Sequence, residues 1–154
     1  MAKFLTQIIT GTSPAAAGTA VISNPIRGLG AFDWFTIDAI VIGGTGGTID
    51  LTLQRKIQNL SDGTAVDLWI DWLHFPQVAA VTTTKFSVQT GVSTTITTVG
   101  MQAESPGTTA ATLAANTFLG GHPGNELRLL ATAGAGTSAG ATQTIYVTAW
   151  SMTK

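Results

Sequence analysis

The stretch TIDLTLQRKI, residues 48–57, alternates apolar and polar side chains with a period of two. Its apolar residues fall on one face, with Arg55 as the exception: Ile49, Leu51, Leu53 and Ile57. A period of two is the side-chain period of a β-strand, and a strand with one apolar face packs on one side only. This stretch therefore predicts a strand of an antiparallel sheet.

The next run, residues 66–75, shows the same alternation. We expect its even-numbered residues from Val66 to Trp72 to point inward, while Trp69 and Leu73 make the opposite face apolar too. Residues 59–64, between the two runs, include the Asn, Ser, Asp and Gly that hairpin loops favour. The two strands should therefore be antiparallel neighbours, and the second apolar face should meet another layer or another subunit.

The rest of the chain also has the pattern of short strands separated by turn residues. Further strands are expected at residues 6–10, 19–23, 33–42, 85–90, 94–99, 117–119, 126–132 and 142–152. Helix signals are almost absent, and residues 110–116 could form a turn or two at most. This pattern favours an all-β fold, a single-domain antiparallel β-sandwich of the jelly-roll type. Residues 14–154 should form the sandwich, with residues 1–13 as an N-terminal arm or as its first strand.

Charged residues are scarce. Asp, Glu, Lys and Arg make up 10% of the 154 residues, against roughly a quarter in an ordinary soluble domain. The net charge is -1 and 44% of the residues are hydrophobic, so charge gives little protection against self-association. The composition therefore favours a protein that works inside an assembly. The sequence has no cluster of Lys or Arg that would indicate nucleic-acid binding, and no run of about 18 apolar residues that would form a membrane helix.

Few residues could perform chemistry. The chain has no cysteine, and its two histidines, His74 and His122, lie in no metal-binding pattern. Asp67 and Asp71 would lie about 13 Å apart along one strand, too far for a catalytic carboxylate pair. The glycine-rich residues 134–140 lack the lysine and the following helix of a phosphate-binding loop. We therefore expect no enzyme activity, no catalytic, metal or cofactor site, and no small-molecule substrate.

The tryptophans are the remaining distinctive residues, and each serves either core packing or contact with another subunit. Trp69 is the favoured contact residue because it points away from the clean apolar face of its strand. The N-terminal segment is a second candidate, since it could order on a partner. The candidate interface residues are Phe4, Leu5, Ile8, Trp34, Trp69, Leu73 and Trp150.

Three segments resemble those of small structural head proteins of tailed bacteriophages. They are DLWIDWLHF at residues 67–75, GGHPG at 120–124 leading into ELRLL at 126–130, and AGAGTSAG at 133–140 before QTIYVT at 143–148. The likeness is greatest to jelly-roll decoration, or cement, proteins and covers residues 33–152. It implies a homotrimer on the outside of the virion that stabilises the lattice of the major capsid protein. Because residues 1–10 lack the apolar run of a secretory signal, we expect synthesis in the host cytoplasm.

Two other roles stay open. The chain could be a tail- or fibre-associated virion protein, since the sequence does not distinguish positions on a particle. It could also be a soluble trimeric jelly-roll binding module of the lectin type. The second role would require Asp33, Trp34 and His122 to converge at one end of the sandwich.

Overall fold

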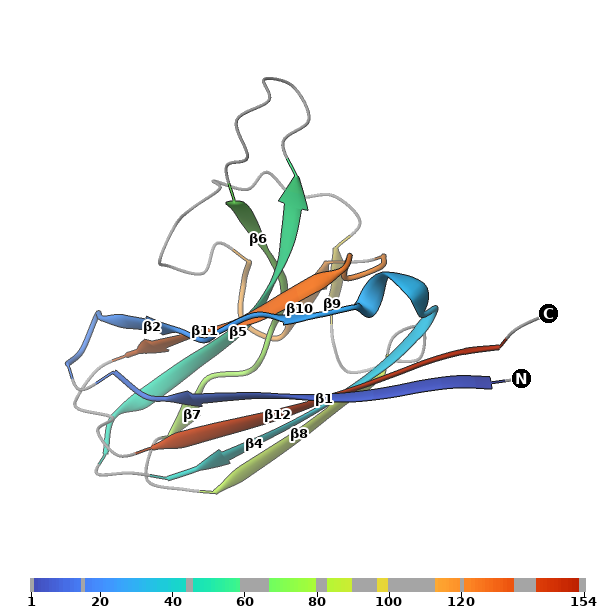
Figure 1. The fold of residues 1–154 in the computed structure, drawn as a ribbon. Coiled ribbons are helices and arrows are strands. Elements are labelled where there is room, and N and C mark those ends of the chain that lie inside the picture. Colours follow the sequence, from blue (N-terminus) through green and yellow to red (C-terminus); the bar gives the residue numbers. More distant parts are fainter. Residues whose placement is uncertain are drawn as a thin grey trace.

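The computed structural model describes residues 2–14, 16–43, 46–58, 67–79, 83–89, 97–99, 113–119, 121–134 and 141–152. Its strands form two sheets that pack face to face (Figure 1). The predicted hairpin loop at 59–64, Val66 and most of the glycine-rich loop lie outside the described residues. Residues 113–116 form a bend and a turn rather than the helix considered for 110–116.

The four-stranded sheet has the order β1-β12-β4-β8, with every neighbouring pair antiparallel. Its strands are β1 (Ala2–Thr12), β12 (Thr142–Met152), β4 (Trp34–Ile42) and β8 (Thr84–Gln89). The pairing runs through these strands without a shift in register. Of the two alternatives for residues 1–13, the structure has the strand, because β1 pairs with β12 along its whole length.

The second sheet has eight strands, with the main order β2-β11-β5-β6-β10-β9. These strands are β2 (Ala20–Ile22), β11 (Glu126–Ala133), β5 (Thr48–Gln58), β6 (Asp67–His74), β10 (Thr117–Leu119) and β9 (Thr97–Val99). Two short strands that the sequence did not predict join it: β3 (Ile26–Arg27) pairs with β11, and β7 (Val78–Ala79) pairs with β5. A 3₁₀ turn, Leu29–Ala31, leads from β3 to β4.

The chain passes back and forth between the two sheets. It runs from β1 to β2 and β3, returns to β4, crosses to the β5–β6 pair, returns to β8, and crosses again to β11 before ending in β12. Strands that are distant in sequence therefore become neighbours, as β1 and β12 do. This wrapped antiparallel arrangement is the jelly-roll sandwich that the sequence predicted.

One side of the sandwich is closed by a side chain of the first strand. Gln7 of β1 donates from Nε2 to the carbonyl of Arg27 at 2.5 Å, and its Oε1 accepts from the Arg27 amide at 3.3 Å. The amide group of Gln7 thus pairs with the backbone of β3 much as a neighbouring strand would. These two bonds link the edge of the four-stranded sheet to the eight-stranded sheet.

The core lies between the sheets and contains aliphatic side chains from both, together with aromatic rings. Trp72 has no exposed surface, and its ring meets Phe35 and Phe118 edge to face. Its indole Nε1 donates to the carbonyl of Gly121 at 3.2 Å. The ring is therefore fixed by packing on its faces and by a hydrogen bond at its polar edge.

A β-bulge in β6 changes which side chains face the core. Leu53 of β5 pairs with Leu73, but the next residue, Gln54, pairs with Asp71, so Trp72 is the extra residue. As a result Trp72 and Leu73 both enter the core, and neither has exposed surface. The prediction that Leu73 lies on the second face, available to a partner, is wrong because the bulge reverses the alternation at that point.

Candidate interaction surface

The outer face of the four-stranded sheet is the side turned away from the core. We define it by the outward residues of its strands. These are Phe4, Thr6, Ile8, Thr10 and Thr12 of β1, Thr142, Thr144, Tyr146, Thr148 and Trp150 of β12, Trp34, Thr36, Asp38, Ile40 and Ile42 of β4, and Lys85, Ser87 and Gln89 of β8. Threonine predominates, which suits a sheet because β-branched side chains pack well on a pleated surface.

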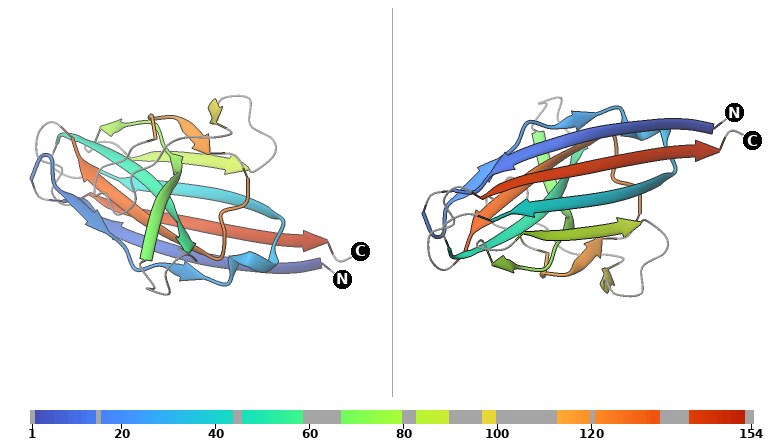
Figure 2. Two further views of the ribbon diagram at one scale, coloured as in Figure 1. Left: turned by 90° about the horizontal axis from the view of Figure 1, so that it is seen from above. Right: turned by 90° about the horizontal axis from the view of Figure 1, so that it is seen from below.

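Three aromatic residues lie side by side on this face. Phe4 pairs with Trp150, and Trp150 pairs with Trp34, so the register of β1, β12 and β4 aligns them in one line across the sheet. We call this line the aromatic row. It lies two residues from Ala2 and Met152, at the end of the sheet where the two termini emerge next to each other (Figure 2).

The outer face carries most of the exposed large hydrophobic residues of the described chain. Six large hydrophobic residues of the described chain are exposed, and four belong to this face: Phe4 at 70%, Ile8 at 52%, Trp34 at 43% and Ile42 at 52%. Trp150 lies between Phe4 and Trp34 and is half-buried. Scattered exposed apolar residues are ordinary, but a gathering on one flat face marks an interaction site. Phe4, Ile8, Trp34 and Trp150 stay predicted interface residues.

Charge is almost absent from the outer face. Its charged members are Asp38 and Lys85, which have opposite signs and lie in adjacent rows of β4 and β8. The hydroxyl of Ser87 donates to Asp38 Oδ1 at 2.6 Å. A carboxylate that already accepts a hydrogen bond loses less when water is removed from it. Covering this face therefore demands little desolvation of charge.

Two other candidate residues have different roles. Leu5 is partly buried and packs against the core from β1. Trp69 points away from the core as predicted, but only 6% of it is exposed. The guanidinium of Arg128 lies 4.3 Å from the centre of a Trp69 ring, a cation–π contact within the chain. Because Trp69 has almost no surface left for a partner to cover, its choice as the main contact residue is wrong.

Replacing Trp69 by alanine should therefore affect stability rather than association. We expect the free energy of unfolding to fall by about 2–3 kcal/mol, because ring packing and the Arg128 contact are lost, but Trp69 lies outside the hydrophobic core cluster. Urea unfolding gives the stability change, and sedimentation gives the mass of any assembly. If Trp69→Ala left the free energy of unfolding unchanged and reduced the mass of the assembly, Trp69 would be a contact residue.

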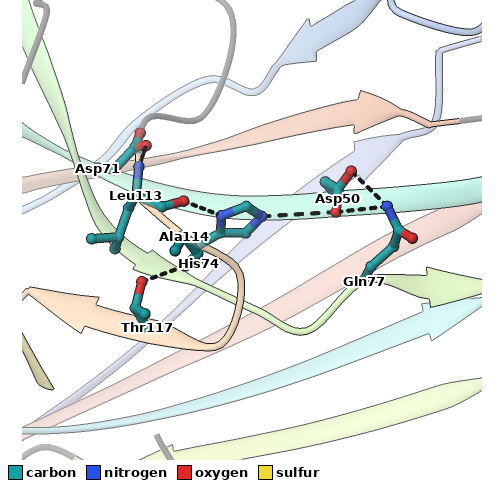
Figure 3. A network of polar contacts seen from close by, with 7 residues as sticks. All are labelled: Asp50, Asp71, His74, Gln77, Leu113, Ala114 and Thr117. Atoms are coloured by element: carbon teal, nitrogen blue, oxygen red, sulfur yellow. Dashed lines mark hydrogen bonds and ion pairs between the residues drawn. The ribbon is translucent and has the colours of Figure 1, made fainter. Parts of the chain in front are cut away.

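A buried polar cluster on the opposite sheet links β5 and β6 to the segment before β10 (Figure 3). Asp71, 1% exposed, accepts hydrogen bonds from Gln54 Nε2 at 2.9 Å and from the Leu113 amide at 3.0 Å.

His74 extends the same cluster: its Nδ1 bonds the Leu113 carbonyl at 2.5 Å, and its Nε2 lies 3.8 Å from Asp50 Oδ1. Gln77 donates to both oxygens of Asp50, and the hydroxyl of Thr117 donates to the Ala114 carbonyl. These contacts use the polar groups to hold the fold, and the sequence did not reveal them.

The other histidine is also held by backbone groups. His122 Nδ1 accepts from the Gly124 amide at 2.9 Å, and Nε2 donates to the Phe32 carbonyl at 2.7 Å. Arg55, the exception in the apolar face of β5, donates to the His122 carbonyl at 2.8 Å. Burial lowers the pKa of the Arg55 guanidinium, which nonetheless remains a cation at neutral pH.

The end-on binding site considered for a lectin-like module is not formed by Trp34 and His122. The ring of His122 packs edge to face on Phe35, with centroids 5.2 Å apart. Phe35 is a core residue, whereas its neighbour Trp34 belongs to the outer face. Successive strand residues point to opposite faces of a sheet, so the two candidate residues lie on opposite sides of β4.

The part of the chain that the structure describes contains no group of three or more His, Asp or Glu side chains that could hold a metal ion. A groove of about 540 Å³ lies where the ends of β1 and β12 meet β2. Its lining is neutral: Thr10, Gly11, Thr12, Val21, Ile22, Ser23, Asn24, Thr142, Gln143 and Thr144. No group in this lining titrates near neutral pH, so the groove offers neither an acid nor a base.

The fold and its outer face thus define an all-β jelly-roll sandwich with a nearly uncharged, threonine-rich sheet surface that carries exposed hydrophobic residues. No family model matches the sequence, no curated protein matches it, and no solved structure matches the fold. No helix in the described residues is long and apolar enough to cross a membrane.

Proposed function

We propose that this chain is a structural virion protein, a capsid decoration or cement protein that binds the outside of a phage head as a homotrimer. In this role it stabilises the lattice of the major capsid protein. The observation that carries the proposal is the outer face of the four-stranded sheet, where four of the six exposed large hydrophobic residues gather with two opposite charges. Such a face is suited to permanent contact with protein.

The composition supports the same role. With 10% charged residues and a net charge of -1, many copies can pack densely on a shell without repelling one another. A trimer presents three attachment points to a repeating lattice, so individually weak contacts give strong overall binding. The jelly-roll fold alone does not specify this function, since the same fold serves many others.

The proposal is tested by counting this chain in purified virus particles from the source system. Quantitative peptide mass spectrometry measures its copy number against the major capsid protein. We expect hundreds of copies in a fixed ratio to the major capsid protein, because a decoration protein occupies repeated sites of the lattice. Absence from particles would overturn a virion role, and a handful of copies would assign the chain to the tail instead.

A further inference from the structure

We propose that other copies of this same chain cover the outer face of the four-stranded sheet, with the aromatic row buried in the contact. This inference rests on the proposed homotrimer and names the surface that forms it.

The exposed apolar residues of the face favour contact with a partner that buries them. Phe4, Ile8 and Trp34 are each more than two-fifths exposed, and they belong to the two strands that flank β12 in the sheet. Aromatic residues are enriched among the residues that contribute most to protein association. Here they occupy a sheet face, so the cover must itself be broad and flat.

The charges of the face favour a copy of the chain as that cover. A copy of the chain that packs on this face meets Asp38 and Lys85 as the charged residues of the face, and the copy itself has a net charge of -1 with 10% charged residues. No excess of one sign therefore opposes the approach. A strongly charged partner would find no complementary charge on this face.

The size of the face matches a specific interface. Strands lie about 4.8 Å apart and rise about 3.3 Å per residue, so four strands of six to eleven residues present about 600 Å². Specific interfaces bury about 600–1,000 Å² on each partner. A copy that covers the whole face therefore reaches the lower end of the range for a stable complex.

The regular geometry of the face suits packing against another sheet. Pairing through β1, β12, β4 and β8 continues without a bulge, unlike the β5–β6 pair of the other sheet. Rows of threonine lie between the apolar residues, and the side chains of two packed sheets interdigitate.

The test compares two variants with the wild-type chain by native mass spectrometry and sedimentation across a range of concentrations. The first variant is Phe4→Thr/Ile8→Thr/Trp34→Thr, which keeps β-branched side chains on the face and adds no charge. The control is Val21→Thr/Ile22→Thr, which makes the same kind of change at exposed residues of β2, outside the face. Circular dichroism checks that both variants keep the strand content of the wild type.

We expect the wild type to form trimers and the first variant to dissociate with a constant at least about 100-fold larger, because two aromatic rings and one aliphatic side chain are removed from the contact together. The control should remain within about threefold of the wild type. A wild-type chain that is monomeric at every concentration would overturn the inference, as would a face variant that associates like the control. Particle counting separates the two proposals: a monomer found on particles contradicts only the inference, and a trimer absent from particles contradicts only the virion role.

Discussion

Replacing Trp72 by alanine is expected to lower the free energy of unfolding by about 3–5 kcal/mol, the usual cost of removing a buried tryptophan. Trp72 is the largest side chain with no exposed surface. The substitution removes its contacts with Phe35 and Phe118 and its hydrogen bond to the Gly121 carbonyl. The change is measured by urea unfolding under conditions where the chain refolds reversibly.

The variant Trp72→Phe serves as the matched control for this prediction. Phenylalanine keeps an aromatic ring in the core and loses the indole N–H, so the expected loss is about 1–2 kcal/mol. The order alanine, then phenylalanine, then wild type in rising stability supports the role of Trp72 at the bulge. A loss below about 1 kcal/mol for Trp72→Ala would show that the core tolerates an empty site there.

The second large effect is expected at Asp71. Replacing Asp71 by alanine should cost about 2–4 kcal/mol, because the Leu113 amide and the Gln54 side chain both lose their acceptor. Asp71 is 1% exposed, so water has little access to the two donors that lose their acceptor. Hydrogen exchange should show faster exchange at the Leu113 amide, which localises the loss to this cluster.

Two controls accompany the Asp71 variant. Asp71→Asn keeps one acceptor oxygen and should cost less than alanine. Asp38→Ala removes a carboxylate of the outer face that bonds only the Ser87 hydroxyl in the described contacts, and it should cost less than about 1 kcal/mol in the dissociated chain. Equal losses at Asp71 and Asp38 would contradict the special role of the buried cluster.

The fold was largely predictable because most strands have a local signal. Alternation placed β4, β5, β11 and β12 within a residue or two of their observed bounds, and β10 at its observed bounds. The short strands β3 and β7 were not predicted because each has two residues, too few to show a period. Leu73 was misplaced because a bulge depends on the pairing with β5 and not on the sequence of β6 alone.

The candidate surface was predictable only in part. The alternation of side chains places Phe4 and Ile8 on one face of β1, and Trp34 on one face of β4. Their alignment with Trp150 depends on the pairing of β12 with both strands, which joins the two ends of the chain. The buried cluster has the same origin. Asp71 meets Leu113 across 42 residues, and Gln54 meets Arg128 across 74. A local sequence pattern does not predict contacts between residues so far apart in the chain. For the same reason the contact of Arg128 with Trp69 was not foreseen, and Trp69 was predicted to be a contact residue.

The proposal that this chain decorates a capsid as a homotrimer joined through the outer face of its four-stranded sheet can be tested by a cryo-electron microscopy reconstruction of the virus particle. We expect trimers of this jelly roll on the outside of the shell, with the row of Phe4, Trp150 and Trp34 of each copy buried against another copy. A shell that lacks the chain, or copies whose outer faces are open to solvent, would contradict it.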